Sequence, residues 1–497
     1  MLLAIMKAYL RHCLFTIIPV FAGLLLLISS GKVHAAPFAI QGPGVNPSDF
    51  RITAFATNIY FPLGMVQLSD GSLLVAISQG SSYWSGSTVG KLLRLTDTNS
   101  DGIADDAGTV LYTGLPGGQT SLRHCGNLFF VTGQGVGRPI SILRAGATPD
   151  AALTLVGAIN LVYPSPGGWL HPHSALNVRP VPGQSESCHL FFQLGSDQNF
   201  SNTVRTVTMT NSQISGAVGT LQGQSIYRLT ITDNLTNVVA SQLTRIAKGL
   251  RNPAGFAFHP VTGDFYFEDN GIDGLVDPNE PFSVDELNFI PAAQVGDGSV
   301  PDFGFPSNYT AYRTGVVVGG AGVQPLVTFQ PLNSSESEGP NDIAFAPLAF
   351  PPGLNNGVFV GFHGKWALGG LANEENPLVF VDLGTTNYWH FISNDETNIG
   401  HLDGLLSTGD SLFLADITRT GNTDTGANSG MIYQIKSLKT FLSFTYNNNV
   451  LELTWPSGVL QQAEDLSGPW DDLTNATSPY QITSELVNSN RFYRTKN

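Results

Sequence analysis

Gly255-Phe256-Ala257-Phe258, a turn, and Phe265-Tyr266-Phe267 form the stretch of sequence that decides the fold. A short apolar strand is joined by a turn of Pro, Gly and Asp residues to a second strand rich in large apolar side chains. Strands this short cannot bury a core alone, so such hairpins must stack on neighbours. The unit recurs in five more places, namely 64–68 with 72–76, 121–122 with 128–131, 175–178 with 190–192, 343–345 with 358–360, and 404–406 with 412–415.

Six copies of one hairpin predict an all-β fold, a six-bladed β-propeller, because radial packing of small sheets leaves few exposed edges. The composition agrees: 55 Gly, 30 Pro and only 12% charged residues are typical of a turn-rich β-protein. Closure of the ring is expected from a strand at Phe50–Ala56 beside Gly430–Ile435. A pair of β-sandwiches or a β-helix is the alternative architecture.

The amino terminus reads as an export signal over residues 1–36. Lys7 and Arg11 precede an apolar run, and small residues ending at Ala35 and Ala36 offer a cleavage site. The alternative is an uncleaved membrane anchor, although the run is short for a spanning helix. We therefore expect a secreted or periplasmic protein with no membrane span after signal cleavage.

Two further divisions of the chain are expected. The propeller should occupy residues 37–437, and residues 438–497 should form a small C-terminal β-sandwich-like module that opens with a hairpin around Asn447-Asn448-Asn449. This tail is similar to the fibronectin-type-III-like tails of secreted bacterial proteins and shows no catalytic group.

Charge and cysteine content narrow the class of protein. A formal charge of −15 argues against a nucleic-acid partner. Outside the export signal the chain has two cysteines, Cys125 and Cys188, in an oxidising compartment where disulfides persist. They either pair or remain two buried thiols.

The most specific motifs follow one another from Gly249 to Asn288. They read Gly-Leu-Arg-Asn-Pro-Ala-Gly at 249–255, Pro-Val-Thr-Gly at 260–263, Asp-Asn-Gly at 269–271 and Asp-Glu-Leu-Asn at 285–288. In this order they resemble the glucose/sorbosone dehydrogenase family, the soluble aldose sugar dehydrogenases that use pyrroloquinoline quinone (PQQ). The likeness extends from about residue 50 to 436.

The resemblance implies a quinone site. Arg251 and Asn252 would contact PQQ, and Lys365 in Phe362-His363-Gly364-Lys365-Trp366 would add a second positive group. A guanidinium offers fixed donors that suit a carboxylated planar ligand. The alternatives are an arginine that pairs with a carboxylate inside the fold and a solvated surface lysine.

Calcium is the second cofactor that the resemblance implies. The carbonyls of Gly271 and Ile272 would hold one ion beside the quinone, and Asp285 and Glu286 would help a second, because hard oxygen ligands suit calcium. All four could instead be turn residues. Asp97, Asn99 and Asp101 form a further calcium-like loop, but Gly108 stands where an EF-hand has its bidentate carboxylate.

Alcohol oxidation also needs a base for the hydroxyl proton, and a neutral histidine suits that task. The family pattern before the third blade's first strand places His171 at this position, with His173 as the second choice. Two positions depart from the family: Ala175 replaces an arginine, and Gly400-His401-Leu402-Asp403 replaces an Arg-Pro pair.

These observations predict an exported quinoprotein that oxidises a small sugar or alcohol and passes electrons to an unknown acceptor. One alternative is a calcium-dependent lactonase-type hydrolase on the same architecture, with Glu268, Asn270 and Asp416 as candidate metal ligands. The other is a non-catalytic binding propeller.

Overall fold

The described part of the chain is almost entirely β-structure. In this computed structural model the described residues include two 3-10 helices, η1 (Pro47–Asp49) and η2 (Ala292–Gln294), and none of them forms a helix with the length and hydrophobicity needed to cross a bilayer. The chain divides into residues 1–36 and 37–497. The predicted export signal lies outside the described residues except for Ala35 and Ala36. The structure describes residues 35–165, 168–273, 279–312, 314–329, 339–364, 377–396, 399–419, 426–439, 442–447, 450–455, 458–483 and 491–496.

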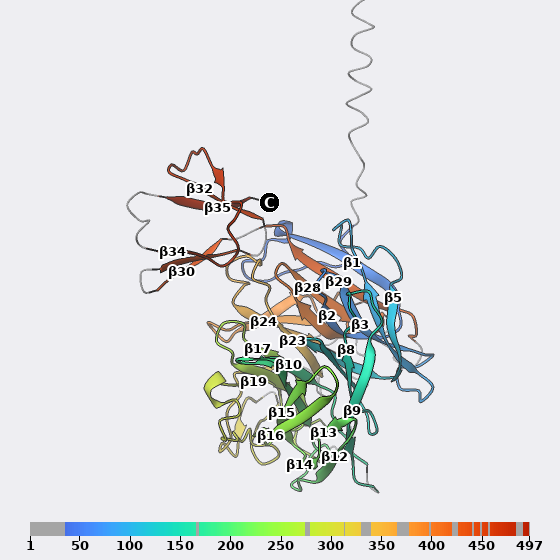
Figure 1. The fold of residues 1–497 in the computed structure, drawn as a ribbon. Coiled ribbons are helices and arrows are strands. Elements are labelled where there is room, and N and C mark those ends of the chain that lie inside the picture. Colours follow the sequence, from blue (N-terminus) through green and yellow to red (C-terminus); the bar gives the residue numbers. More distant parts are fainter. Residues whose placement is uncertain are drawn as a thin grey trace, which may run out of the picture. The chain divides into compact units, whose positions relative to one another are not determined.

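Six antiparallel sheets form the blades of a six-bladed β-propeller, as the six hairpins predict (Figure 1). In the first five blades the strands run in chain order from the inner to the outer edge. From inner to outer strand, the blades are β2 (Pro62–Gln67), β3 (Leu73–Gln79), β4 (Val89–Leu95), β5 (Thr109–Pro116); β6 (Gln119–Cys125), β7 (Leu128–Gly133), β8 (Ile140–Arg144), β9 (Thr154–Val162); β10 (Leu176–Val181), β11 (Gln184–Leu194), β15 (Ser225–Asp233), β16 (Val238–Lys248); β17 (Pro253–Phe258), β18 (Phe265–Asp269), β19 (Asp285–Ile290), β22 (Val327–Phe329); β23 (Pro340–Phe345), β24 (Gly357–Phe362), β25 (Leu378–Asp382), β26 (Tyr388–Ile392); and β27 (Leu402–Ser407), β28 (Ser411–Asp416), β29 (Gly430–Ser437), β1 (Phe50–Ile59).

Short strands extend two of the blades. Strands β12 (Thr206–Ser212) and β14 (Gly219–Gln222) continue the second blade, and β13 (Ile214–Ser215) pairs in parallel with β16 of the third. A separate ribbon of β20 (Tyr309–Thr310) and β21 (Val317–Val318) lies in the long connection inside the fourth blade.

Closure of the ring follows the predicted route. Strand β1 from the start of the propeller pairs antiparallel with β29 near its end, with Phe50 opposite Ser437 and Ile59 opposite Gly430. The innermost strands then contact one another around the axis in the order β2, β6, β10, β17, β23, β27 and back to β2. At Gly64 and Gly404 a Cβ atom would collide with the backbone of the next blade's inner strand, at Leu122 and Leu63 respectively. Glycine at these positions therefore permits close approach of the blades.

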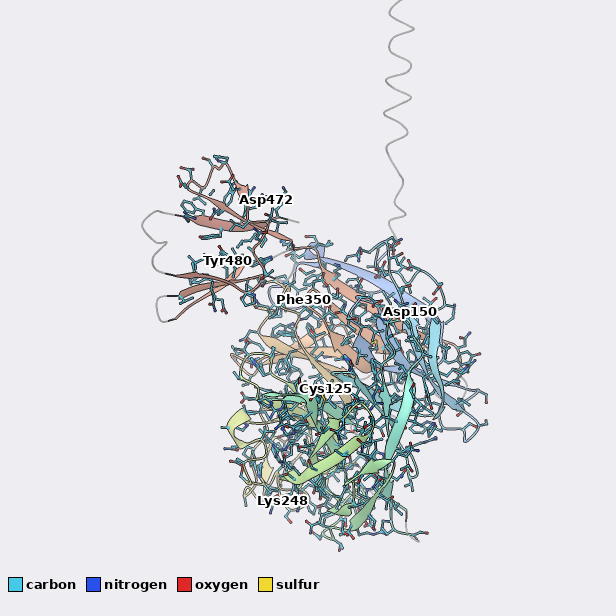
Figure 2. All side chains as sticks on the ribbon, viewed as in Figure 1. Cys125, Asp150, Lys248, Phe350, Asp472 and Tyr480 are labelled. Carbon is cyan, nitrogen blue, oxygen red and sulfur yellow. A yellow bond between two sulfur atoms is a disulfide. The ribbon has the colours of Figure 1, made fainter. Side chains whose placement is uncertain are left out.

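The hydrophobic core lies between neighbouring blades, as expected for sheets too small to bury a face alone. Between the first and second blades, for example, Leu74 and Leu92 meet Leu122 and Phe129. The other five blade interfaces have apolar clusters of the same kind. Figure 2 shows the side chains that fill these interfaces, including Phe350, which is fully buried.

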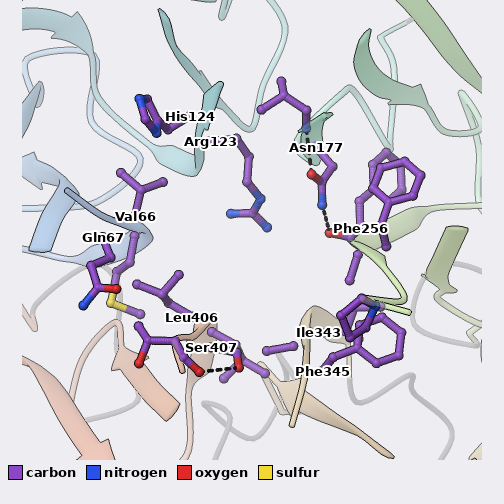
Figure 3. Close-up of a pocket in the computed structure, with 18 of the residues that line it drawn as sticks. Val66, Gln67, Arg123, His124, Asn177, Phe256, Ile343, Phe345, Leu406 and Ser407 are labelled. Carbon is purple, nitrogen blue, oxygen red and sulfur yellow. Dashed lines mark hydrogen bonds between the residues drawn. The ribbon is translucent and has the colours of Figure 1, made fainter. Parts of the chain in front are cut away.

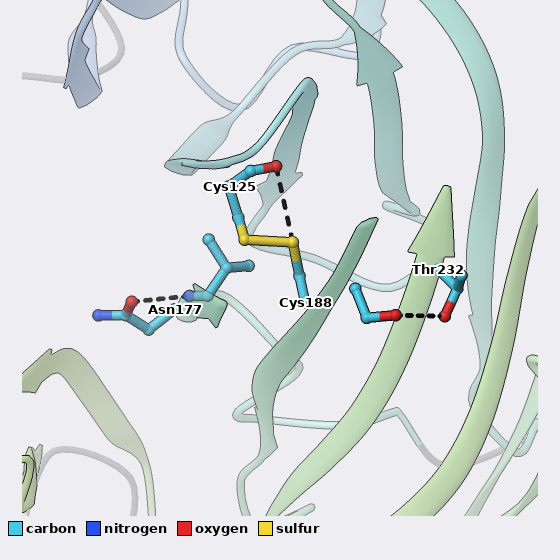
Figure 4. Close-up of a disulfide and its surroundings, with 6 residues drawn as sticks. Cys125, Asn177, Cys188 and Thr232 are labelled. Atoms are coloured by element: carbon cyan, nitrogen blue, oxygen red, sulfur yellow. Dashed lines mark hydrogen bonds between the residues drawn. A yellow bond between two sulfur atoms is a disulfide. The ribbon is translucent and has the colours of Figure 1, made fainter. Parts of the chain in front are cut away.

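Cys125 and Cys188 form a disulfide, which decides between the two predicted states of these thiols (Figure 4). Cys125 ends the inner strand β6 of the second blade, whereas Cys188 lies within β11, the second strand of the third blade. The two residues therefore occupy different positions in their blades. The bond joins neighbouring sheets across their apolar interface.

The C-terminal residues form two small three-stranded sheets. One contains β30 (Ser443–Asn447), β31 (Val450–Thr454) and β34 (Tyr480–Thr483), and the other contains β32 (Val459–Ala463), β33 (Asp471–Asp472) and β35 (Phe492–Lys496). Strands β30 and β31 are the predicted hairpin, with Asn447 opposite Val450. Leu453, Trp455, Leu460 and Ile482 form a core of their own. A separate module from residue 438 stays a proposal.

Candidate functional site

Most of the predicted site residues lie at one mouth of the propeller, whereas the loop of Asp97, Asn99 and Asp101 lies beside the turn between β2 and β3, at the other end of the first blade. His171 precedes the inner strand β10, Arg251 and Asn252 precede β17, and Gly271 follows β18. In an antiparallel hairpin, the start of the first strand and the end of the second lie at the same end of the sheet. The opposite ends of five inner strands and the middle of β10 line one shared cavity, so the inner strands run in the same direction. The motifs from different blades therefore face the same space.

Arg251 is buried, with 2% of its surface exposed, and its guanidinium is committed to protein groups. Nη2 forms an ion pair with Asp273 at 3.0 Å and donates to Oδ1 of Asn199 at 2.5 Å. Nε donates to the backbone carbonyl of Asn199 at 3.1 Å, and Nη1 to that of Asn270 at 3.3 Å. Burial lowers the pKa of Arg251, and Asp273 offsets this effect. The arginine thus ties a loop of the third blade to a loop of the fourth.

Asn252 and the backbone of Arg251 are held by Asp269. Its carboxylate accepts the N–H of Arg251 at 2.9 Å and that of Asn252 at 2.7 Å. The Asn252 side chain donates to Oδ1 of Asn270 at 2.8 Å, and Asn270 in turn donates to the carbonyl of Pro340 at 2.8 Å. This chain of hydrogen bonds makes the Arg-Asn-Pro turn rigid.

His171 stands close to Arg251. Its backbone N–H donates to Ser196 at 3.0 Å, and Gly195 is so tightly enclosed that a Cβ there would lie 2.7 Å from Cβ of His171 and 2.7 Å from the carbonyl oxygen of Arg251. Nε2 of His171 is buried and has no hydrogen-bond partner. Burial, and then the nearby charge of Arg251, hold the pKa of His171 well below its usual value. The imidazole is therefore neutral at neutral pH.

His173 has a different environment, in which one ring nitrogen already has a partner. The Tyr163 hydroxyl accepts the backbone N–H of His173 at 2.8 Å and lies 2.8 Å from Nδ1 of the same residue. That hydroxyl either donates to Nδ1 or accepts from it, so Nδ1 is occupied in both tautomers. Burial lowers the pKa of His173 to about 4, so the ring is neutral. Because the hydroxyl of Tyr163 occupies Nδ1 of His173, His171 is the better candidate for the base.

The predicted calcium ligands lie in two facing segments. The N–H of Gly271 donates to Oδ1 of Asp285 at 2.8 Å, and Ile272 exchanges hydrogen bonds with Ser283, its N–H donating to Oγ at 2.7 Å and its carbonyl accepting the N–H at 3.0 Å. Asp285 and Glu286 are consecutive residues of β19, so their side chains point to opposite faces of the sheet. One ion therefore does not take both carboxylates directly.

Buried carboxylates crowd both faces of the β18–β19 pair. Glu286 lies opposite Asp269 on one face. Burial, and then the charge of Asp269, raise the pKa of Glu286 to about 8, while burial raises that of Asp269 to about 7. On the other face, Glu268 is fully buried with both carboxylate oxygens lacking a hydrogen-bond partner, and burial raises its pKa well above the usual value. Excess negative charge of this kind would be relieved by a bound cation or by protonation.

The loop with Asp97, Asn99 and Asp101 uses its side-chain oxygens internally. Asp97 accepts the N–H groups of Asp101 and Gly102 at 3.1 and 2.9 Å, and Asp101 accepts that of Ile103 at 2.9 Å. These bonds are those of an Asp-rich turn. Calcium binding there stays a prediction, and Lys365 lies outside the described residues.

The candidate ligands of the hydrolase alternative come from two blades. Glu268 and Asn270 belong to the fourth blade and Asp416 to the sixth. Within the described ranges, the group of His, Cys, Asp and Glu residues whose ligand atoms converge includes neither Glu268 nor Asp416.

Sequence reasoning missed two residues that shape the mouth with His171 and Arg251, namely Asn199 and Tyr163, because neither belongs to a recognised motif.

A cavity of about 670 Å³ lies on the axis at the opposite ends of the inner strands. Figure 3 shows Arg123 pointing into it from β6, between Asn177 and Leu406. Arg123 forms an ion pair with the buried Asp342 across the ring at 3.0 Å. This pair links the second and fifth blades.

Comparison with known proteins gives three findings. No family model matches the chain. An uncharacterized protein of Borreliella burgdorferi is 31% identical over 169 residues, which are 31% of this chain and 41% of that protein, so the match spans about two fifths of the relative.

Solved structures similar to this chain are sugar dehydrogenases of the kind that the motifs resemble. The PQQ-bound aldose sugar dehydrogenase of Streptomyces coelicolor is 15% identical with a TM-score of 0.47, covering 79% of this chain and 99% of that one. The PQQ domain of Coprinopsis cinerea pyranose dehydrogenase is 15% identical with a TM-score of 0.49, covering 82% and 99%. The soluble aldose sugar dehydrogenase of Escherichia coli is 13% identical with a TM-score of 0.48, covering 78% and 99%. Likeness at this level assigns no activity to this chain.

Proposed function

We propose that this protein is an exported, PQQ- and calcium-dependent oxidoreductase that oxidises a sugar or a related alcohol, with His171 as the base. The single observation that carries the proposal is the state of His171: a neutral imidazole whose buried Nε2 has no hydrogen-bond partner, held beside a cation at the mouth of the propeller. The ordered motifs from Gly249 to Asn288 support it from the sequence.

The chain's own groups suit the proton transfer. A substrate hydroxyl within reach of the imidazole would give its proton to His171, and the depressed pKa keeps that ring in the unprotonated form that a base must have. The guanidinium of Arg251 lies close enough to His171 to lower its pKa, so negative charge that develops on oxygen at this mouth is favoured. When bound, PQQ supplies the acceptor for the hydride.

The described residues fit the cofactors to different degrees. Asp269 and Glu286, whose pKa values are raised to about 7 and about 8, fit a cation, because calcium would neutralise two carboxylates that now repel one another. Arg251 fits a carboxylated quinone less well, since its donors already bind Asn199 and Asp273. A bound quinone would therefore contact the backbone of Arg251 and the neighbouring residues, and not the guanidinium group of Arg251.

The test is reconstitution of the purified protein with calcium and PQQ. Binding of the quinone would be followed by its absorbance, and turnover by dye reduction with a panel of aldoses and alcohols. We expect turnover that requires both cofactors and falls by about a hundredfold or more in His171→Gln, whereas His124→Gln, on an exposed side chain, leaves it unchanged.

Two results would count against this function. Absence of quinone binding at micromolar concentrations would exclude the dehydrogenase function and leave a non-catalytic binding propeller as the explanation. Hydrolysis of a lactone panel that needs calcium but no quinone would replace it with the hydrolase alternative.

A further inference from the structure

Three side chains outside the site described above converge at the junction of the fifth and sixth blades. His363, His401 and Asp403 each direct one potential ligand atom to a common point, and these atoms all lie within 4.8 Å of one another. Nδ1 of His363 is 2.9 and 3.1 Å from the two carboxylate oxygens of Asp403. The two imidazole rings lie 4.7 Å apart, centre to centre, at an angle of 57°.

The fold holds these groups firmly. His363 directly follows β24 of the fifth blade, while His401 and Asp403 flank the first residue of β27, the inner strand of the sixth. The carbonyl of His401 accepts the N–H of Ile417 at 3.1 Å, and Asn341 of β23 donates to Oδ1 of Asp403 at 2.7 Å. Two blades thus position the cluster before any ligand binds, the condition for a precise metal site.

Burial and access are also suitable. His401 is fully buried and Asp403 is 2% exposed, whereas the side chain of His363 is 20% exposed. Two ligands are therefore fixed in the interior, and the third faces a route from solvent. A hydrogen bond between His363 and Asp403 by itself would not require a second imidazole at the same point.

We propose that His363, His401 and Asp403 bind a divalent first-row transition metal ion such as zinc. Two imidazole nitrogens and one carboxylate oxygen are a ligand set for zinc, iron or cobalt, whereas calcium prefers oxygen ligands alone. Three protein ligands leave a coordination position open to water or to a bound molecule. The site lies at the start of an inner strand, as do His171 and Arg251, and so at the same mouth.

This inference does not depend on quinone binding. His401 and Asp403 lie in the stretch 400–403, where the chain departs from the Arg-Pro pair of the family that it resembles, so a metal ion would bring positive charge to that stretch.

The experiment uses the full protein, purified without a histidine tag and treated with a chelator. Zn²⁺ is titrated by calorimetry, and Co²⁺ by its visible absorption bands, whose intensity reports the coordination number of the bound ion. We expect one ion per chain, no competition from Ca²⁺, and affinity reduced about tenfold or more in His363→Ala and in Asp403→Asn.

His124→Ala is the matched control and should bind as the wild type does. His363→Ala changes a partly exposed side chain, so it tests the site even where a change at His401 prevents folding, and circular dichroism checks that each variant is folded. Equal binding by wild type, His363→Ala and Asp403→Asn, or no binding by the wild type at micromolar metal, would overturn the proposal.

Discussion

The disulfide provides the sharpest stability prediction. Cys125 and Cys188 are separated by 63 residues and join the second and third blades. In the chain-entropy treatment, opening a loop of that length at 25 °C costs about 4 kcal/mol of stability, because the unfolded chain regains the freedom that the bond removes. Both positions are buried among apolar residues, so Cys125→Ala/Cys188→Ala removes the bond without burying a hydroxyl group.

The assay is urea unfolding followed by tryptophan fluorescence, comparing the double variant with the oxidised and the reduced wild type. We expect the double variant to lose about 4 kcal/mol, and the reduced wild type to lose a similar amount. A single Cys125→Ala variant should match the double variant, since either change opens the loop. A loss below about 1 kcal/mol would refute the reasoning, because it would mean that the bond does not restrict the unfolded chain as the loop length requires.

Three further outcomes follow from buried polar groups. Tyr163→Phe should cost about 2 kcal/mol, measured by urea unfolding, because the lost hydroxyl makes two buried hydrogen bonds; a neutral result would show that these bonds do not stabilise the fold. In the absence of calcium, the thermal unfolding midpoint should decrease as the pH is raised from about 5 to about 9, because Glu286 and Asp269 hold protons in the folded state that the unfolded chain has released. Saturating calcium should flatten this dependence. A midpoint that increases over this pH range would contradict the reasoning. Arg123→Met should cost about 3 kcal/mol by leaving the buried carboxylate of Asp342 without its cation. The double variant with Asp342→Asn should recover part of that loss, because the amide removes the charge and still offers an acceptor to the backbone N–H groups of Ile343 and Leu405; no recovery would show that the ion pair is not the cause.

Much of the fold was predictable because its signals are local. Each hairpin is specified by short apolar strands and the turn between them, as in 255–258 with 265–267, and repetition of the unit implies stacking. The pairing of β1 with β29 was predictable as well, since a ring of blades needs a strand to close it. The same local rule brings together the motifs before inner strands and after second strands, because these positions lie at one end of a hairpin; their role as a site stays a prediction.

The state of each site residue was not predictable in this way. The partners of Arg251 come from a loop of the third blade and from Asp273, and Nδ1 of His173 is occupied by the Tyr163 hydroxyl across a loop. Such partners are remote in the chain, and no spacing rule specifies them. The same holds for His363 and His401, which the sequence shows only as separate histidines.

By itself, then, the sequence determined the class of fold, the six blades and the strand that closes them, since hydrophobic periodicity and turn chemistry act over a few residues. Only the tertiary structure decided that the two cysteines pair, that Arg251 is held by Asn199 and Asp273, and that His363 meets Asp403. Those contacts join different blades, and their geometry exists only once the ring of sheets has packed.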